Sequence, residues 1–386
     1  MPTWLFTEKI HNMLETLNDW TTMLDNQSQV DVIYLDFAKA FDKIPHDILL
    51  NKLIALRLIE HLIRWLNDFL TDRTFQVKVG SQLSRFRSAP CGVPQGAVLS
   101  PVLFGIFVNE LSSLLPENVH YKQFADDTKL YSSVNNKTVE NSLQKGIDIV
   151  VEWSRSSKLP LNNAKTVALT VGKVRKETEY SIDGQTIKKE NLTRDLGFLI
   201  SNKLDFTEHW RKTTNTAKFL TAQIFNQYNS KKIRLMVLLY KTFIRPVLEY
   251  GNSISSPLKV SDENLIESVQ NSFTRRLYSR HTGKYLRPND PGYKTSIEHQ
   301  LYGLSSLKDR RLQIDKKLIE KMMSGKIDLN TADFFTLSQN NRTRAKTSFV
   351  WKRPKNKLRR KFFVNRTLTY LTQLNSTSNA PQRSLV

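Results

Sequence analysis

Cysteine is almost missing from this chain of 386 residues, because Cys91 is the single one. A disulfide needs two cysteines, so neither a disulfide framework nor a cysteine-rich zinc site can form within the chain. This usage suits a reducing compartment, and we expect an intracellular protein, with nucleus and cytoplasm both open.

Long hydrophobic runs are missing as well. The most apolar helical run, Leu235–Ile244, contains Lys241 and is too short to span a bilayer. The segment Met1–Trp20 does not resemble a signal peptide, since it contains the charged residues Glu8, Lys9, Glu15 and Asp19. We therefore expect no membrane insertion.

Acidic residues are scarce relative to basic ones. The chain has 36 Asp and Glu against 58 Lys and Arg, which gives a formal net charge of +22. Such an excess attracts polyanions, with nucleic acid the first candidate and an anionic membrane surface the second. The imbalance is strongest after Asp333, where no acidic residue follows and where these basic residues gather: Arg342, Arg344, Lys346, Lys352, Arg353, Lys355, Lys357, Arg359, Arg360, Lys361 and Arg366.

Aromatic residues are interleaved with this basic run, namely Phe349, Trp351, Phe362 and Phe363. Basic side chains neutralise phosphates, and aromatic rings can stack on bases. We therefore predict that residues 331–386 form a basic, partly disordered tail that contacts nucleic acid. The alternative is a solvated tail whose charge only aids solubility.

Apolar residues make up 39% of the chain, which is enough for a globular core. Their spacing changes near residue 205 from mixed helices and strands to helices almost throughout, and we place a boundary there. Before it we expect helices over Thr7–Leu24, Ile48–Leu70, Leu99–Leu115 and Val139–Ser156, a strand buried on both faces over Val30–Phe37, a hairpin of Phe75–Val79 with Arg85–Ser88, and strands over Ala164–Gly172 and Leu196–Ser201. After it we expect helices over Phe206–Asn226, Lys231–Tyr250, Asp262–Leu277 and Leu307–Met323, the last with Ser306 and Asp309 as a capping box and Gly325 at its end.

Two adjacent carboxylates stand between two short segments that are typical of strands. The sequence Phe124-Ala125-Asp126-Asp127 separates Val119–Gln123 from Thr128–Val134. Neighbouring like charges repel unless a cation lies beside them, and hard divalent cations prefer carboxylate oxygens. The alternative is a solvated acidic turn, because Asp is common in turns.

A third carboxylate, Asp36, ends the buried strand, and an unpaired charge at such a position is costly. The acidic hairpin follows 90 positions later (126 − 36). If both belong to one sheet, Asp36 and Asp126 can meet around metal ions. Two ions held in this way would serve phosphoryl transfer.

The segment Gly92–Pro101 combines glycines and prolines in a tight turn directly before a helix. Backbone N–H groups at such a turn can face an anion. Gln95 can both donate and accept hydrogen bonds toward a nucleotide. The alternative is an ordinary loop, for which glycine and proline are equally typical.

These segments, in this order, resemble the palm of a reverse transcriptase, and more narrowly the jockey-like group of non-LTR retrotransposon polymerases. The resemblance extends over roughly residues 12–375 and rests on LDFAKAFD (Leu35–Asp42), GVPQGAVLSP (Gly92–Pro101), FADD (Phe124–Asp127), LNNAKT (Leu161–Thr166), DLGFLI (Asp195–Ile200), IESVQ (Ile266–Gln270), LYGL (Leu301–Leu304), Arg310-Arg311 and FFVNR (Phe362–Arg366). It implies an α+β fold, namely a right-hand polymerase palm with an antiparallel sheet, followed by an all-α thumb or connection region. The implied division is a residual N-terminal helix, a remnant of the fingers (1–29), the palm (30–204), the thumb or connection (205–330) and the tail (331–386).

The resemblance also implies roles for single residues. Asp36, Asp126 and Asp127 would be catalytic metal ligands, assisted by the carbonyl of Phe37. Phe41 would lie beneath the sugar of the nucleotide and exclude a 2′-hydroxyl, and Gln95 would contact the nucleotide. Lys165 could donate a proton to pyrophosphate, and Leu196 with Gly197 would form the primer grip. Without the resemblance, Phe41 would be interpreted as a core aromatic and Lys165 as a solvated lysine.

The implied reaction is extension of a DNA primer on an RNA template by deoxynucleoside triphosphates, with two Mg²⁺ ions, or Mn²⁺ in their place. No membrane is implied as a partner, and no oligomeric state is indicated. The chain lacks the fingers region and the endonuclease domain usual in this group, so we expect a truncated element. A catalytically silent nucleic-acid-binding remnant is the first alternative, and a group II intron enzyme is the second.

Overall fold

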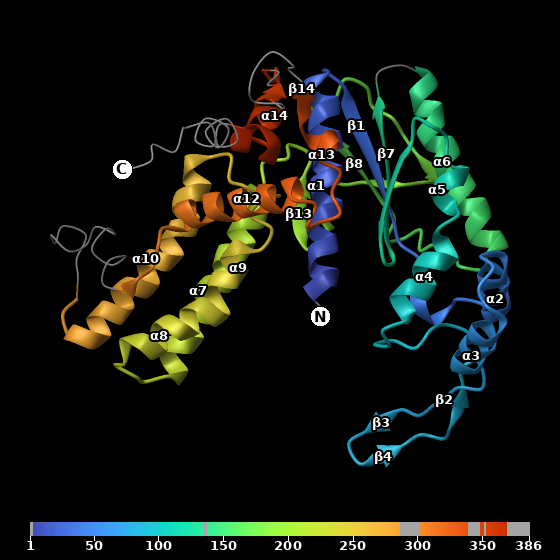
Figure 1. Ribbon diagram of the computed structural model, residues 1–386, viewed down its shortest axis with the longest axis horizontal. Coiled ribbons are helices and arrows are strands. Elements are labelled where there is room, and N and C mark those ends of the chain that lie inside the picture. Colours follow the sequence, from blue (N-terminus) through green and yellow to red (C-terminus); the bar gives the residue numbers. More distant parts are fainter. Residues whose placement is uncertain (1–2, 135–136, 286–301, 339–347, 351–352, 369–386) are drawn as a thin grey trace, which may run out of the picture. The chain divides into compact units, whose positions relative to one another are not determined.

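The computed structural model describes residues 3–134, 137–285, 302–338, 348–350 and 353–368 (Figure 1). The chain divides into two compact units. We call Ser28–Leu196 the sheet unit, and Met1–Gln27 together with Gly197–Val386 the helical unit. The boundary between the two units, between Leu196 and Gly197, lies a few residues before the change in apolar spacing near residue 205. Within the described part of the chain, no helix is both long and apolar enough to cross a membrane.

The sheet unit is built on five strands in the order β11-β8-β1-β7-β6. The central strand β1 pairs antiparallel with both β7 and β8, β6 pairs antiparallel with β7, and β11 is parallel to β8. Almost every residue of β1 is buried, which confirms the strand predicted to be covered on both faces. The bounds are β1 Gln29–Leu35, β6 His120–Phe124, β7 Asp127–Val134, β8 Val167–Val171 and β11 Lys188–Lys189.

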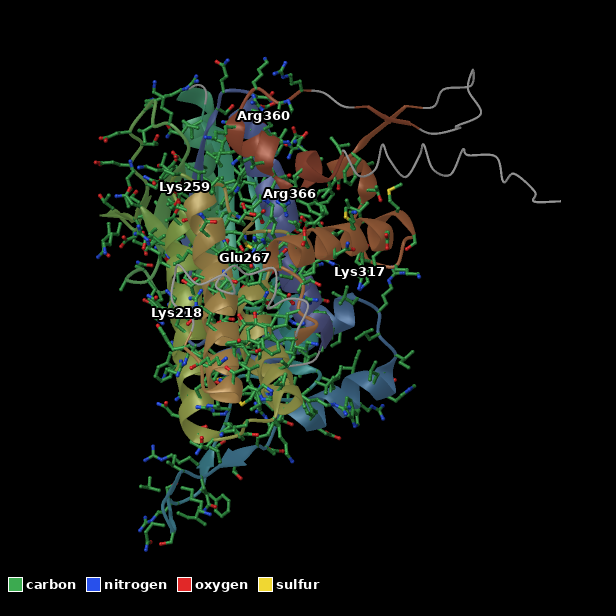
Figure 2. The ribbon with its side chains drawn as sticks, turned by 90° about the vertical axis from the view of Figure 1, so that its left-hand side faces the viewer. Lys218, Lys259, Glu267, Lys317, Arg360 and Arg366 are labelled. Carbon is green, nitrogen blue, oxygen red and sulfur yellow. The ribbon has the colours of Figure 1, made fainter. Side chains whose placement is uncertain are left out.

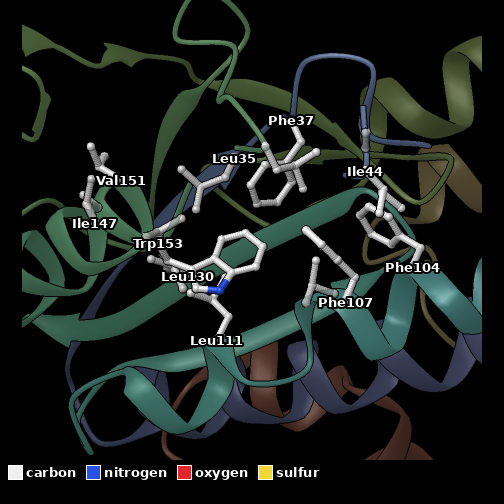
Figure 3. Close-up of a cluster of buried hydrophobic side chains, with 14 of the residues drawn as sticks. Leu35, Phe37, Ile44, Phe104, Phe107, Leu111, Leu130, Ile147, Val151 and Trp153 are labelled. Atoms are coloured by element: carbon white, nitrogen blue, oxygen red, sulfur yellow. The ribbon is translucent and has the colours of Figure 1, made fainter. Parts of the chain in front are cut away.

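Helices cover one face of this sheet, and Figure 3 shows the core between them. Side chains of Leu35 and Leu130 from β1 and β7 pack with Phe104, Phe107 and others from the helices. Each large apolar side chain that is fully buried contributes about 1.5–3 kcal/mol to stability. The helices of the unit are α2 (His46–Ala55), α3 (Glu60–Leu70), α4 (Ser100–Val108), α5 (Leu111–Leu114) and α6 (Lys137–Ser156).

Two predicted helices are each broken in two. The helix predicted over Ile48–Leu70 is wrong, because Arg57 adopts φ 57° and α2 has already ended at Ala55. A residue in the left-handed region ends a helix, and glycine normally occupies that position. The helix predicted over Leu99–Leu115 is also wrong, since α4 ends at Val108 and α5 begins at Leu111; here Asn109 and Glu110 between them keep right-handed angles.

The small strands of the sheet unit flank its turns. The predicted hairpin around Gly80-Ser81 is confirmed, because Val79 pairs with Gln82 and Phe75 with Arg87. The bounds are β2 Thr74–Phe75, β3 Lys78–Val79, β4 Gln82–Leu83, β5 Arg87–Ser88, β9 Ser181–Ile182, β10 Gln185–Thr186 and β12 Leu192–Asp195.

The helical unit begins with α1 (Thr3–Asp25) and continues after the sheet unit. Figure 2 shows it with side chains, with Lys218 of α7 and Lys317 of α12 on opposite sides of the view. Its further elements are β13 Phe198–Ser201, α7 Thr207–Gln227, α8 Ile233–Leu239, a π-helical turn Tyr240–Ile244, α9 Arg245–Glu249, α10 Val260–Thr282, α12 Leu307–Met323, α13 Thr331–Phe334, β14 Thr336–Ser338, β15 Ser348–Val350 and α14 Lys357–Lys361.

The predicted ends of α12 are confirmed. The backbone N–H of Asp309 donates to Ser306 Oγ at 3.0 Å, and Ser306 Oγ donates to the Asp309 carboxylate at 2.6 Å. Gly325 follows the helix with φ 64°, where glycine is favoured.

His209 of α7 is a buried histidine of the same unit. Burial, and then the positive charge of Lys212, lower the pKa of its imidazole to about 4. The ring is therefore neutral near pH 7, and its Nδ1 accepts a hydrogen bond from the backbone N–H of Leu199.

The basic run near the C-terminus is partly built into the helical unit. Arg359 donates to Asn18 Oδ1 at 2.8 Å, and Arg366 pairs with Asp315 at 2.8 Å. Phe362 and Phe363 are buried, so the prediction that these two rings stack on bases is wrong. They complete a protein core instead.

Other residues of this basic run were predicted to contact nucleic acid but lie outside the described residues. They are Arg342, Arg344, Lys346, Trp351 and Lys352, together with the side chain of Phe349. For these positions the contact with nucleic acid stays a prediction.

Candidate active site

Asp36 is held at the end of β1 by the segment that precedes β8. The backbone N–H of Asn162 donates to the carbonyl of Asp36 at 2.7 Å, and the N–H of Ala38 donates to the carbonyl of Pro160 at 2.8 Å. Between them, Phe37 is buried with its ring edge against Trp153, at 5.9 Å between centroids. These contacts fix the backbone on both sides of the carboxylate, which itself stays partly exposed.

The acidic pair lies at the tip of the hairpin formed by β6 and β7. Phe124 pairs with Asp127, so Ala125 and Asp126 form a two-residue turn. Ala125 adopts φ 52°, a conformation typical of the first central residue in such tight turns. Both Asp126 and Asp127 are exposed, so the turn carries its negative charge at the surface of the sheet unit.

The strand register brings the three carboxylates to one end of the sheet. Leu35 and Thr128 form the last pair of β1 and β7, so Asp36 directly follows this pair in the chain and Asp127 directly precedes it. Among the described residues, however, no three His, Cys, Asp or Glu side chains form a group that could hold a metal ion. The backbone therefore brings the acids together, while their side chains do not form a ready-made metal site.

Lys165 lies beside this end of the sheet. Its Nζ is 3.8 Å from a carboxylate oxygen of Asp36, and neither side chain is buried, so the pair adds little to stability. The turn that carries Lys165 is closed by its backbone N–H, which donates to the carbonyl of Asn162 at 3.1 Å. The same turn therefore holds Asp36 and presents a cation next to it.

The segment around Gln95 runs along the residues that follow Asp36. The N–H of Val93 donates to the carbonyl of Phe41 at 2.7 Å, and Gln95 Nε2 donates to Asp42 Oδ1 at 2.9 Å. Gly92 has φ 81° and lies against the backbone of Asp42. The structure thus brings Gln95 next to the segment that begins with the strand-end carboxylate.

We predict that Gly92→Ala destabilises the sheet unit by about 2–4 kcal/mol. A Cβ at Gly92 would lie 2.6 Å from the carbonyl oxygen of Asp42, and alanine would also be strained at φ 81°. Gly96→Ala is the matched control, since Gly96 has φ 86° but no atom within 4 Å of its Cβ position. Urea unfolding of both variants measures the difference. Equal losses would show that the close approach to Asp42 contributes nothing.

Phe41 is half-buried and stacks on Phe104, with 4.9 Å between ring centroids. It belongs to the short 3₁₀ helix Ala40–Asp42 that follows Asp36. This environment fits a core aromatic, and the partly exposed side leaves room for a second role. The predicted contact with a sugar remains a prediction.

A buried ion pair next to the acidic turn was missed by the sequence analysis. Lys129 Nζ lies 2.7 Å from Asp195 Oδ2, and both side chains are 4% exposed. Tyr34, the cross-strand partner of Lys129, lies close to the same carboxylate. Burial, and then the charge of Asp195, raise the pKa of the Tyr34 hydroxyl well above its usual range. The available signal was a lysine inside the strand predicted over Thr128–Val134.

The predicted primer-grip residues form a tight turn directly after Asp195. Leu196 adopts φ 45° and Gly197 adopts φ 97°, so two successive residues occupy the left-handed region. Leu196 is buried. Asp195, the acidic member of the buried ion pair, is the last residue of the strand β12 and directly precedes this turn.

Residues 6–224 match the reverse transcriptase (RNA-dependent DNA polymerase) family. The match spans more than half of the chain, so the chain belongs to the reverse transcriptase family.

Among its relatives, the chain is similar to the RNA-directed DNA polymerase from mobile element jockey of Drosophila melanogaster. The two are 26% identical over 327 residues, which cover 82% of this chain and 34% of that protein. It is also 25% identical to the probable RNA-directed DNA polymerase from transposon BS of the same species, over 70% of this chain and 31% of that protein. The chain thus spans about a third of the length of these relatives.

A solved structure of apo telomerase from Candida tropicalis is also similar. The sequences are 14% identical, the likeness covers 73% of this chain and 47% of that chain, and the TM-score is 0.38. A likeness of this strength carries no argument about the site.

Proposed function

We propose that this chain is an RNA-directed DNA polymerase of a non-LTR retrotransposon, with the sheet unit as a polymerase palm and the helices after residue 205 as a thumb or connection region. The observation that carries the proposal is the strand register in a chain of the reverse transcriptase family, because Asp36 and Asp127 are the residues next to the last pair, Leu35 and Thr128. The substrates would be an RNA template, a DNA primer and deoxynucleoside triphosphates.

The reaction joins the primer to one nucleotide. The 3′-hydroxyl of the primer attacks the α-phosphorus, a phosphodiester bond forms, and the bond to pyrophosphate breaks as the hydroxyl proton leaves. Asp36, Asp126 and Asp127 supply the carboxylate oxygens that Mg²⁺ or Mn²⁺ prefers, so the donor set fits a divalent cation. When bound, two such ions would lower the pKa of the attacking hydroxyl and neutralise charge on the leaving pyrophosphate.

Other residues of the sheet unit would position the substrates. Gln95, held by Asp42, is exposed and can hydrogen-bond to the incoming nucleotide. Lys165, whose Nζ lies beside the carboxylate of Asp36, would donate a proton to pyrophosphate. The turn of Leu196 and Gly197 would support the primer, and the carbonyl of Phe37 would assist the metal ligands.

Primer extension tests the proposal directly. The purified chain is incubated with a labelled DNA primer on an RNA template, deoxynucleotides and either Mg²⁺ or Mn²⁺. We expect template-dependent lengthening of the primer with release of pyrophosphate. Salt-sensitive binding of the primer–template without any extension would instead support a silent nucleic-acid-binding remnant.

We predict that Phe41→Val increases the use of ribonucleotides relative to deoxynucleotides by about tenfold or more. The phenyl ring would exclude a 2′-hydroxyl by its size, and valine leaves that space open. The measurement is the ratio of kcat/KM for the two nucleotides, which a general loss of stability would not change. Phe41→Tyr keeps the ring and serves as the control. An unchanged ratio in Phe41→Val would leave Phe41 as a core residue that packs on Phe104.

A further inference from the structure

Three arginines gather near the end of α10 in the helical unit. Arg276 and Arg280 are four residues apart and so lie on the same face of the helix, with Arg275 beside them. Both Arg276 and Arg280 lie over the ring of Phe225 from α7, with guanidinium carbons 4.4 Å and 4.7 Å from its centroid. The buried ring of Phe225 therefore makes cation–π contacts with two guanidinium groups.

Arg280 is fixed by the end of α7. It donates hydrogen bonds to the carbonyls of Phe225 at 2.7 Å and Tyr228 at 2.6 Å. Burial and the neighbouring Arg280 lower the pKa of Arg276. No carboxylate among the described residues pairs with Arg276 or Arg280. The two positive charges are thus close together and lack an anionic partner in the described part of the chain.

A pocket of about 430 Å³ opens beside these arginines. Its lining adds the hydroxyl groups of Ser272 and Ser279 and the ring of Tyr285, which is 79% exposed. The volume falls within the range of about 300–1,000 Å³ that is typical of ligand sites. Guanidinium and hydroxyl groups are the donors that bind phosphate oxygens, and an exposed tyrosine ring can stack on a base.

We propose that this pocket binds a nucleotide of a single-stranded nucleic acid, with its phosphate on Arg275, Arg276 and Arg280 and its base on Tyr285. A phosphate supplies the anion that the pair of Arg276 and Arg280 lacks. An unpaired base is needed for stacking, which favours a single strand over a duplex. The site contains none of the three carboxylates, and binding there does not depend on polymerase activity.

The test measures binding of fluorescent single-stranded RNA and DNA oligonucleotides to the full chain. We expect Arg276→Gln to weaken binding about tenfold, and Tyr285→Ala about fivefold or more. The dependence of log affinity on log salt should also become shallower by about 0.7 in Arg276→Gln, which corresponds to one phosphate contact. Comparing the RNA and DNA arms identifies the strand that the pocket prefers.

Arg234→Gln is the matched control, because it removes one exposed arginine from α8 of the same unit. Thermal unfolding checks that each variant folds, and Arg276→Lys keeps the charge without the planar fork. Equal affinity of Arg276→Gln and Arg234→Gln would overturn the proposal. Competition by polyglutamate as strong as that by RNA would also overturn it, because the pocket would then bind any polyanion.

Discussion

Asp126→Asn is expected to abolish primer extension, with a loss of at least about 10³-fold. Asn keeps the shape of the side chain but removes the charge, and stabilisation by a bound metal contributes several kcal/mol, at about 1.4 kcal/mol per tenfold in rate. Asp126 is exposed in the two-residue turn between β6 and β7, where Asn is also favoured. The fold should therefore remain intact, and primer extension under single-turnover conditions measures the loss.

Asp148→Asn is the matched control for this experiment. It makes the same chemical change at an exposed position of α6, in the same unit. We expect its extension rate to equal that of the unchanged chain. Undiminished extension by Asp126→Asn would refute the assignment of the acidic turn, and an equal loss in Asp148→Asn would point to a general effect of charge.

Lys129→Met is expected to lower the free energy of unfolding of the sheet unit by about 3–5 kcal/mol. The change leaves the carboxylate of Asp195 buried without its cation, next to the buried hydroxyl of Tyr34. Methionine fills a similar volume, so the loss should come from the unpaired charge rather than from a cavity. Urea unfolding and hydrogen exchange of the β1 and β7 amides measure the effect.

The double variant Lys129→Met/Asp195→Leu separates charge from packing. Replacing both members of a buried ion pair by apolar residues is often close to neutral, so the double variant should be more stable than Lys129→Met. Lys145→Met, at an exposed position of α6, controls for the loss of a lysine. A double variant as unstable as the single one would show that packing, and not the unpaired charge, dominates.

Much of the candidate site could be predicted from the sequence because its signals are local. The strand pattern before Asp36 and the acidic turn at Asp126 were each visible in a short window, and the order of the motifs indicated the family. The start of α12 was equally visible, since Ser306 and Asp309 stand three residues apart.

What the sequence did not reveal depends on tertiary contacts. Lys129 and Asp195 are 66 positions apart, and only the folded sheet unit makes them neighbours. The break between α2 and α3 uses Arg57 in a conformation for which glycine is the usual signal. Phe362 and Phe363 look like stacking rings in a basic run, yet packing in the helical unit buries them.

The sheet unit is an uninterrupted stretch of chain, whereas the helical unit is assembled from two stretches on either side of it. During synthesis α1 leaves the ribosome before the sheet unit, but Asp25 bonds to the backbone of Asn356, 331 positions later. Domains generally fold as units as they emerge. Ser28–Leu196 can thus fold on the nascent chain. In contrast, α1 can form its contact with Asn356 only after that much later segment has been synthesised.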